Sequence, residues 1–259
     1  MTSSLNLSSY DISKEVLEYR LENLIFSQNM LNSWKRDKEE FIEKYIRNIF
    51  WSDDSQKDRD YEENMSYGRE FHLMCQRIFL DIPEIIEFED EVSTSKKEDK
   101  SKNSFYENQS INKFSDTDKE SLKKIKSIKE MYIKKYGDKV VFKPECTIEL
   151  KSNILVNLDL LVEVYDSEKL IKIDIWDWKV EKRKTEIDYA IKRMQTMVYM
   201  YVCKMSLGEN LDFEDITMHY YQPIHDNNVV IKYNEQLHTK FENEIKTTIS
   251  EIKNMKWEV

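Results

Sequence analysis

Residues 173–179 of the chain have the sequence IDIWDWK, and this segment constrains the fold more than any other. An apolar run leads into it and tryptophans alternate with polar residues, so we expect a β-strand that is covered on both faces. Side chains two residues apart in a strand project from the same face, which places Asp177 beside Lys179. A carboxylate and an amine where water is scarce need a partner, a metal ion or a chemical role.

The pattern Asp/Glu-x-Lys is common in a chain that is 35% charged. Its other occurrences lie in polar or helical sequence, or at a strand end in the case of Glu149 and Lys151. Only Asp177 and Lys179 follow a strand-like apolar run, so we single out this pair.

A second carboxylate, Asp159, lies in another strand-like segment, residues 153–165. The polar residues 166–169 predict a turn between the two strands, and antiparallel pairing would bring Asp159 toward Asp177. Two buried carboxylates repel each other unless a cation lies between them, and oxygen ligands suit Mg²⁺ or Mn²⁺ rather than zinc. In the alternative, structural interpretation Asp159 caps a bulge and Asp177 pairs with Lys179. The residues alone leave both interpretations open.

Residues 186–207 carry apolar side chains at three- and four-residue spacing, which predicts an amphipathic helix. On this helix Gln195 and Tyr199 lie one turn apart, and we expect them to form a polar ridge with Asp188 and Lys192. Gln195 is then either a functional residue or an ordinary residue at the boundary between the apolar and polar faces.

Upstream, Gly68 opens a predicted helix that runs to Leu80. His72 lies one turn after Gly68, on the side of Gln76 and Phe79. A single histidine in such a place is either a structural residue or a metal ligand, and the spacing does not decide between them.

The remaining pattern predicts an α/β (α+β) fold. Residues 11–50 predict helices that are broken at Ser27, an expected N-cap. Residues 89–115 are rich in Ser, Lys, Asp, Glu and Asn without apolar periodicity, and we predict a flexible insertion there. A helix over 116–136 that closes at Gly137 follows.

The second half of the chain predicts a mixed β-sheet. In addition to the two strands above, strands are expected over 140–150, 216–222 and 229–233, and a last helix begins at Asn234. The elements follow the order αβββαβ with a helical collar, in a single domain over residues 1–259. Glu145 and Glu149, on the first strand, are either additional carboxylates of the site or surface residues at a strand edge.

Bulk properties exclude several classes of protein. With 259 residues, 40% hydrophobic and 12% aromatic, the chain can bury a core. No apolar run approaches the ~20 residues that span a membrane, and the N-terminus does not resemble a signal peptide. The three scattered cysteines fit a reducing cytoplasm. The glycine-poor loops lack a phosphate-cradling motif, which argues against nucleotide hydrolysis.

The net charge of −10 argues against a general nucleic-acid coat protein, since nonspecific affinity comes mainly from Lys and Arg. Local basic clusters remain compatible with binding at one face. The candidates for nucleic-acid binding are Lys182, Arg183 and Lys184, which follow the Asp177 strand, and Lys192. Each cluster is otherwise an ordinary solvated surface.

In this order the motifs resemble the PD-(D/E)XK nuclease superfamily, specifically its RecB-like exonuclease branch. That branch has a glycine-led helix with a histidine, a strand with Asp, a strand with Asp-x-Lys, and a helix with Gln-x-x-x-Tyr. Residues 27–34 and 41–46 are also similar to the N-terminal helices of the family, so the resemblance spans roughly residues 27 to 222. The matching site residues are His72, Asp159, Asp177, Lys179, Gln195 and Tyr199.

The resemblance implies a restriction-endonuclease-like core and a metal-dependent nuclease, with DNA as the expected substrate in repair, recombination or defence. It implies that Asp159 and Asp177 hold Mg²⁺ or Mn²⁺ with His72 as an outer ligand. It further implies that Lys179 orients a water or stabilises negative charge, and that Gln195 and Tyr199 contact the phosphate or position the Lys179 strand. A protein partner in a repair or defence complex is also compatible with the resemblance.

Several members of the family carry a four-cysteine iron–sulfur cluster. Here Lys35, Arg36 and Asp37 stand where the first of these cysteines would be, and Cys75, Cys146 and Cys203 include no close pair. We therefore expect no iron–sulfur cluster.

Two other functions remain open from the sequence. The first is a catalytically silent nuclease fold that binds nucleic acid or a protein partner. The second is a purely helical interaction protein built on the Lys/Glu-rich segments, and a substantial strand content would count against it.

Overall fold

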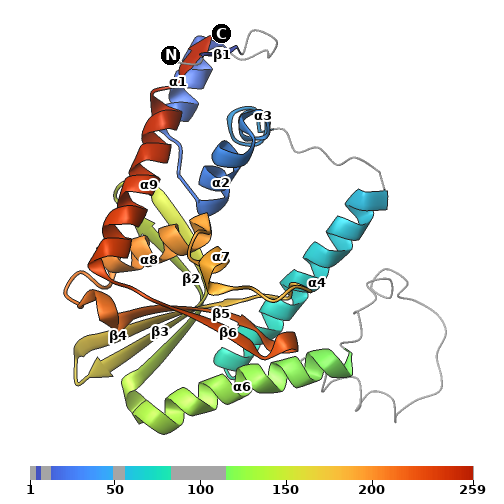
Figure 1. The fold of residues 1–259 in the computed structure, drawn as a ribbon, viewed down its shortest axis with the longest axis vertical. Coiled ribbons are helices and arrows are strands. Elements are labelled where there is room, and N and C mark those ends of the chain that lie inside the picture. Colours follow the sequence, from blue (N-terminus) through green and yellow to red (C-terminus); the bar gives the residue numbers. More distant parts are fainter. Residues whose placement is uncertain (1–3, 7–12, 49–55, 83–114, 259) are drawn as a thin grey trace, which may run out of the picture.

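A computed structural model describes residues 4–6, 13–48, 56–82 and 115–258. A five-stranded mixed sheet forms its middle layer, and helices cover both faces of this sheet (Figure 1). The ends of the chain meet at a small parallel pair of strands, β1 (Ser4–Asn6) and β7 (Lys256–Glu258).

The central sheet has the strand order β2-β3-β4-β5-β6. Its strands are β2 (Val140–Leu150), β3 (Ile154–Asp166), β4 (Lys169–Trp178), β5 (Ile216–Gln222) and β6 (Asn227–Lys232). All neighbouring strands are antiparallel except β4 and β5, which are parallel. The parallel pair needs a crossover, and the helices after β4 provide it.

The helices before the sheet are α1 (Lys14–Glu22), α2 (Gln28–Arg36), α3 (Lys38–Phe41), the π-helical turn η1 (Ile42–Ile46), α4 (Gln56–Phe79) and α6 (Asp116–Tyr136). Those within and after it are α7 (Ile187–Ala190), α8 (Met194–Ser206) and α9 (Glu235–Lys253). Short 3₁₀ turns are η2 (Gly137–Lys139), η3 (Phe213–Asp215) and η4 (Pro223–His225).

Each face of the sheet packs on its own apolar cluster. On one face, residues of α2, α8 and α9, such as Leu31, Val198 and Phe241, pack against Ile175 of β4. On the other face, residues of α4 and α6 pack against Trp176 and Trp178. Successive residues of a strand point to opposite faces, so β4 supplies both clusters by alternation.

Most elements expected from the sequence are confirmed. The helix over 116–136 and the strands over 140–150 and 216–222 have the predicted bounds, and β3 and β4 form the predicted antiparallel hairpin. Ser27 caps α2, since its Oγ accepts a hydrogen bond from the backbone nitrogen of Met30 at 3.2 Å. The sheet excludes the purely helical alternative and confirms the α/β class.

The prediction of a single amphipathic helix over 186–207 was wrong. The chain breaks into α7 and α8, and Arg193, with an extended ψ of 136°, is the N-cap of α8. Residues 196–203 are all buried, so α8 has no continuous polar face. Asp188 therefore does not continue a ridge with Gln195 and Tyr199.

Gly68 does not open its helix either, because α4 begins at Gln56. A Cβ at Gly68 would meet Val180 Cγ2 at 3.9 Å, which is ordinary van der Waals contact. The helix therefore continues through this glycine, and packing does not require a glycine there.

The predicted flexible insertion over 89–115 lies outside the described residues except for its last one, Ser115, which caps α6. The described helices include none with the length and apolar character that a membrane crossing requires.

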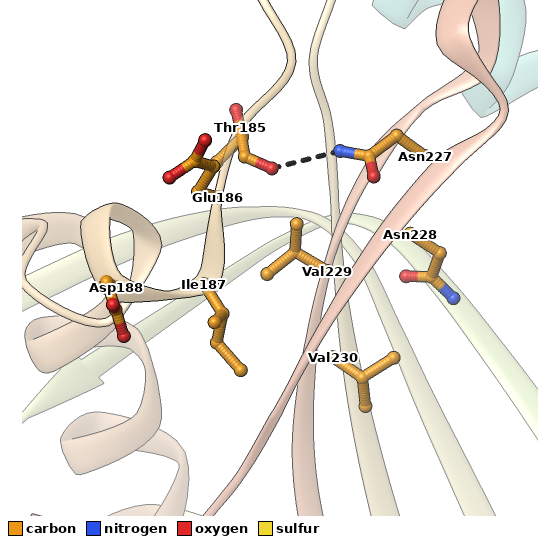
Figure 2. A pocket seen from close by; sticks show the side chains of 8 residues that line it. All are labelled: Thr185, Glu186, Ile187, Asp188, Asn227, Asn228, Val229 and Val230. Atoms are coloured by element: carbon orange, nitrogen blue, oxygen red, sulfur yellow. Dashed lines mark hydrogen bonds between the residues drawn. The ribbon is translucent and has the colours of Figure 1, made fainter.

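A groove of about 510 Å³ lies between α7 and the edge strand β6 (Figure 2). Thr185, Asp188, Asn227 and Val229 are among its lining residues, and Asn227 Nδ2 donates to the Thr185 carbonyl at 3.0 Å. None of the six site residues expected from the sequence lines this groove.

Candidate metal-dependent active site

The strands β2 and β3 change faces at the same level of the sheet. Leu158 packs in the cluster with α8, whereas Leu160 packs in the cluster with α4. Strict alternation would place both on one face, so the backbone is locally distorted between them. The opposite strand has its irregularity at Glu145, whose φ is +49° and which lacks a paired residue in the ladder. This bend brings the side chains of Glu145 and Asp159 out of the regular core pattern.

The side chain of Asp159, in β3, contacts both β4 and α4. Its Oδ2 accepts a hydrogen bond from the backbone nitrogen of Trp178 at 2.8 Å, and its Oδ1 lies 3.2 Å from Nδ1 of His72. The other ring nitrogen of His72, Nε2, lies 3.1 Å from the carbonyl oxygen of Trp178. A carbonyl can only accept, so Nε2 carries a proton. Nδ1 is then either protonated or presents a lone pair toward Asp159, and a lone pair there requires a cation between the two groups.

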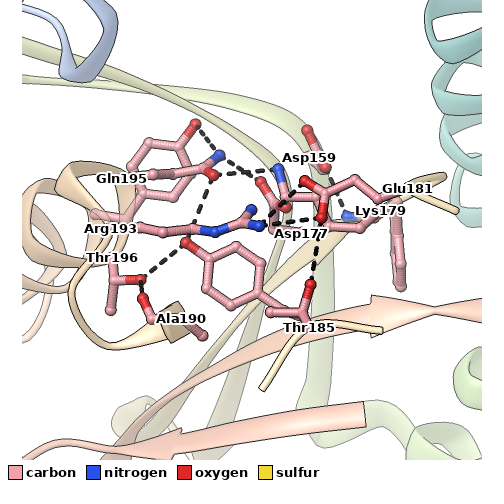
Figure 3. Close-up of polar contacts among 12 residues, drawn as sticks. Asp159, Asp177, Lys179, Glu181, Thr185, Ala190, Arg193, Gln195 and Thr196 are labelled. Carbon is pink, nitrogen blue, oxygen red and sulfur yellow. Dashed lines mark hydrogen bonds and ion pairs between the residues drawn. The ribbon is translucent and has the colours of Figure 1, made fainter. Parts of the chain in front are cut away.

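Asp177 and Lys179 lie together at the end of β4, as their spacing predicts (Figure 3). Asp177 is 1% exposed, and its Oδ2 lies 2.7 Å from Nζ of Lys179. Gln195 bridges the pair, because its Nε2 donates to Asp177 Oδ1 at 2.5 Å and its Oε1 accepts from Lys179 Nζ at 3.1 Å. Tyr199 supports the bridge, since its hydroxyl accepts from Gln195 at 3.3 Å and donates to the Asn157 carbonyl at 2.7 Å.

The break between α7 and α8 positions Gln195. Thr196 Oγ1 donates to the Ala190 carbonyl at 2.5 Å and lies 2.8 Å from the hydroxyl of Tyr220, in β5. Arg193 Nη2 donates to both carboxylate oxygens of Glu181, at 3.1 and 3.0 Å (Figure 3). These contacts replace the helical hydrogen bonds lost at the break, and they hold the first turn of α8 over Asp177.

Burial and neighbouring charge perturb the acids of the site. Burial raises the pKa of Asp177 to about 6, with Lys179 lowering it and the Asp159 carboxylate raising it. Burial and Asp159 also raise the pKa of Glu145. Burial lowers the pKa of His72, but its hydrogen bond and charge interaction with Asp159 outweigh this, so the pKa is raised above 6.5. These shifts are those of carboxylates crowded together where water is scarce.

The side chains fit a divalent cation. In the described ranges of the chain, His72, Glu145 and Asp159 form a group whose potential ligand atoms all lie within 4.8 Å of one another. Asp177 Oδ2 is buried and, apart from its charge contact with Lys179, has no hydrogen-bond partner among the described residues. Carboxylate oxygens with one imidazole suit Mg²⁺ or Mn²⁺.

The structure thus brings together all six residues expected from the sequence, His72, Asp159, Asp177, Lys179, Gln195 and Tyr199. The sequence left the roles of Glu145 and Glu149 undecided. Glu145 lies in the possible metal-binding group with His72 and Asp159, whereas Glu149 is exposed at the surface. Lys182, Arg183 and Lys184 are exposed in the loop after β4, and Lys192 is exposed in the break between α7 and α8.

Sequence reasoning missed Glu181, Arg193, Thr196 and Tyr220, which position the catalytic-type side chains. Tyr220 pairs with Asp177 across the parallel strands β4 and β5, and only the register reveals this contact. Arg193 falls inside the predicted helix, and no local signal marks the break. The ion pair between exposed Glu181 and half-buried Arg193 joins two loops, and only the tertiary fold reveals it.

These residues are carried on a bent mixed sheet between two layers of helices, and three of them form a group that could hold a metal ion. The family model of the PD-(D/E)XK nuclease superfamily matches residues 26–259, and the chain belongs to this superfamily. The superfamily expected from the sequence is therefore confirmed. A search of curated proteins finds no match to the chain.

Proposed function

We propose that the protein is a metal-dependent nuclease of the RecB-like branch that hydrolyses phosphodiester bonds in DNA, as an exonuclease in repair, recombination or defence in the cytoplasm. The observation that carries the proposal is the joint placement of Asp177, Lys179 and Gln195 beside Asp159. A buried ion pair with its own bridging amide, next to a second carboxylate, is an expensive arrangement for stability alone.

Asp159, Asp177 and His72 are the proposed ligands of Mg²⁺ or Mn²⁺. Glu145 belongs with Asp159 and His72 to the group whose potential ligand atoms lie within 4.8 Å of one another, whereas Asp177 is outside that group and pairs with Lys179. A bound divalent ion supplies Lewis-acid polarisation of the scissile phosphate and lowers the pKa of a coordinated water. The protein orients these ligands through the Trp178 backbone, which binds Asp159 by its nitrogen and His72 by its carbonyl.

Lys179 carries the positive charge of the proposed mechanism. Its ammonium group, held by Asp177 and Gln195, stabilises negative charge that develops on the phosphate or orients the attacking water. Gln195 fixes the rotamers of both charged partners. Tyr199 is 4% exposed and donates to Asn157, so we assign it a positioning role rather than contact with the substrate.

The test is an assay of the purified protein on end-labelled single- and double-stranded DNA, with and without Mg²⁺ or Mn²⁺. Asp177→Asn preserves shape but removes charge from the metal site, so cleavage should fall by about 10²-fold or more while the fold survives. Lys179→Met should also abolish turnover. DNA affinity of both variants should stay within about tenfold of the wild type, since phosphate contacts elsewhere provide most of it.

Circular dichroism and thermal unfolding of each variant provide the control for folding. The proposal fails if the wild-type protein cuts no nucleic acid with either metal, or if folded variants cut as well as the wild type. DNA binding without cleavage would instead identify a catalytically silent nuclease fold. In that case Asp177 and Lys179 are a structural ion pair, and loss of one partner should cost about 3–5 kcal/mol of stability.

A further inference from the structure

A second groove opens beside the catalytic side chains. It has a volume of about 380 Å³, within the range of about 300–1,000 Å³ typical of ligand sites. Helix α2 contributes Gln28 and Asn32, and the break between α7 and α8 contributes Tyr189, Lys192 and Gln195. Because Gln195 also binds Asp177, the groove shares one wall with the proposed active site.

Tyr189 is an aromatic side chain held in place at the surface. It is 63% exposed, and the guanidinium carbon of Arg193 lies over its ring, 4.7 Å from the centroid. Arg193 is itself held by Glu181 and lies 5.3 Å from the ring centroid of buried Tyr220. One face of the Tyr189 ring is therefore covered by a fixed cation, and its large exposed fraction leaves area for a flat partner.

Glu181 also lines the groove, but its carboxylate is paired with Arg193, and the remaining polar groups suit a polyanion with hydrogen-bonding edges. Lys192 is exposed, and its Nζ makes no ion pair with the residues that the structure describes. The amides of Gln28 and Asn32 offer both donors and acceptors. An exposed lysine beside an exposed aromatic ring and side-chain amides combines the elements that bind one nucleotide of a single strand.

We infer that this groove is a nucleotide subsite, in which an unpaired base next to the scissile phosphate stacks on Tyr189 and Lys192 binds a backbone phosphate. Bases inside a duplex are covered on both faces, so stacking on Tyr189 selects a single strand or a frayed end. The inference rests on the proposed nuclease function only for the position of the scissile phosphate. Binding can be measured without cleavage.

The experiment is fluorescence anisotropy of the full-length protein with a short labelled single-stranded oligodeoxynucleotide, in EDTA so that no strand is cut. Tyr189→Ala should weaken single-strand binding by about 5- to 100-fold, the loss expected for one stacked base. Tyr189→Phe, which keeps the ring, should stay within about threefold of the wild type. Tyr19→Ala is the matched control, because Tyr19 is 68% exposed on α1 and does not line the groove.

Two further measurements separate stacking from charge. A fully abasic strand of equal length should bind the wild type and Tyr189→Ala alike, because it keeps the phosphates and lacks bases. Lys192→Ala should reduce the slope of log K against log salt by about 0.7, the value for one phosphate contact on a single strand, whereas Tyr189→Ala should leave this slope unchanged.

Equal affinities of the wild type and Tyr189→Ala for the base-containing single strand would overturn the subsite. It would also be overturned if Tyr189→Ala lost as much affinity for duplex DNA, or for the abasic strand, as for the base-containing single strand. A wild type that binds no single strand would overturn it too. Cleavage by the wild type together with equal affinities refutes the subsite and leaves the nuclease function standing. If single-strand binding depends on Tyr189 but the wild type cleaves no DNA with Mg²⁺ or Mn²⁺, the subsite stands and the nuclease function is refuted.

Discussion

His72 shows at the scale of single residues how the backbone prepares a ligand. The Trp178 carbonyl fixes a proton on Nε2, and Nδ1 faces the same space as Asp159 and Glu145, where it presents a lone pair when a cation is bound. Neutral imidazole adds no charge to a cation otherwise held by oxygens, whereas each carboxylate adds a full negative charge. Each carboxylate should therefore contribute more to metal affinity than His72.

We expect Mn²⁺ affinity, measured by isothermal titration calorimetry, to fall more in Asp159→Asn than in His72→Ala. Glu145→Gln should fall between these two if Glu145 is a ligand, because it keeps its shape and loses its charge. Glu149→Gln, an exposed carboxylate on the same strand, is the matched control and should bind like the wild type. An unchanged affinity in Glu145→Gln would remove Glu145 from the metal site.

Asp174 is a buried carboxylate that the sequence did not reveal, on the face of β4 opposite Asp177. It is 1% exposed, accepts a hydrogen bond from Tyr132 at 2.6 Å, and is paired with Lys172. His219 Nε2 lies 3.7 Å from its other oxygen. Burial raises the pKa of Asp174, but its interactions with His219, Lys172 and Tyr132 outweigh this and lower it to about 2.

Because its pKa is lowered in the folded protein, ionised Asp174 stabilises the fold, and this contribution is lost when acid protonates the carboxylate. Its ordinary pKa is 3.8, so its contribution is fully present above about pH 4 and is lost as the pH falls toward 2. The difference in free energy of unfolding between the wild type and Asp174→Asn should shrink by about 2–3 kcal/mol across this window. Urea titrations at several pH values measure it. A difference that stays constant with pH would contradict the assignment.

At the scale of elements, one buried side chain clamps the loop between β4 and α7. Gln222, at the end of β5, is 0% exposed. Its Oε1 accepts from the Thr185 nitrogen at 2.7 Å, and its Nε2 donates to the carbonyl of Arg183 at 2.8 Å. This loop carries Glu181, whose ion pair with Arg193 holds the break before α8. The clamp thereby connects the end of β5 to the position of Gln195.

Gln222→Leu should lower the free energy of unfolding by about 1–3 kcal/mol, because it leaves buried backbone groups of the loop without partners. Nuclease activity should fall as well, since Arg193 and Gln195 lose their fixed positions. His225→Ala is the control: His225 contacts the same loop from a half-buried place, with Nε2 at 3.0 Å from the Lys182 carbonyl, and its loss should cost about 0.5 kcal/mol or less. Equal stability of Gln222→Leu and wild type in denaturant unfolding would refute the clamp.

At the scale of the whole molecule, α4 and α6 are joined by contacts that do not involve the segment between them. Lys129 Nζ donates to the Ile78 carbonyl at 2.9 Å and pairs with Asp81 at 2.7 Å, and the hydroxyl of Tyr67 donates to Asp118 at 2.5 Å. These contacts hold α4 and α6 together over Trp176 and Trp178 without any contribution from the segment that connects the two helices. The composition of residues 91–110, which lie outside the described residues, predicts that they add no apolar core.

Replacing residues 91–110 by a short Gly/Ser linker should therefore leave the thermal unfolding midpoint within about 2–4 °C of the wild type. Limited proteolysis of the full chain should cut first inside this segment. A chain that resists proteolysis there, or a deletion that fails to fold, would show that the segment is structural and that the domain is organised differently from the sequence prediction.

The sequence alone determined the elements with strong local signals. The period of two in β3 and β4, the turn between them and the cap at Ser27 follow from neighbouring residues, and so does the contact between Asp177 and Lys179. The ordered motifs also sufficed to identify the superfamily, which the match over residues 26–259 confirms.

Only the tertiary structure decided which other groups surround that pair. Glu145 reaches His72 and Asp159 because two strands bend at one level, and α8 starts at Arg193 because Glu181 and Thr196 hold the break. Such contacts join residues far apart in the chain, and their free energy comes from packing and pairing register rather than from local propensity. A sequence pattern reports local preference, so the break, the bend and the groove beside Tyr189 were beyond its reach.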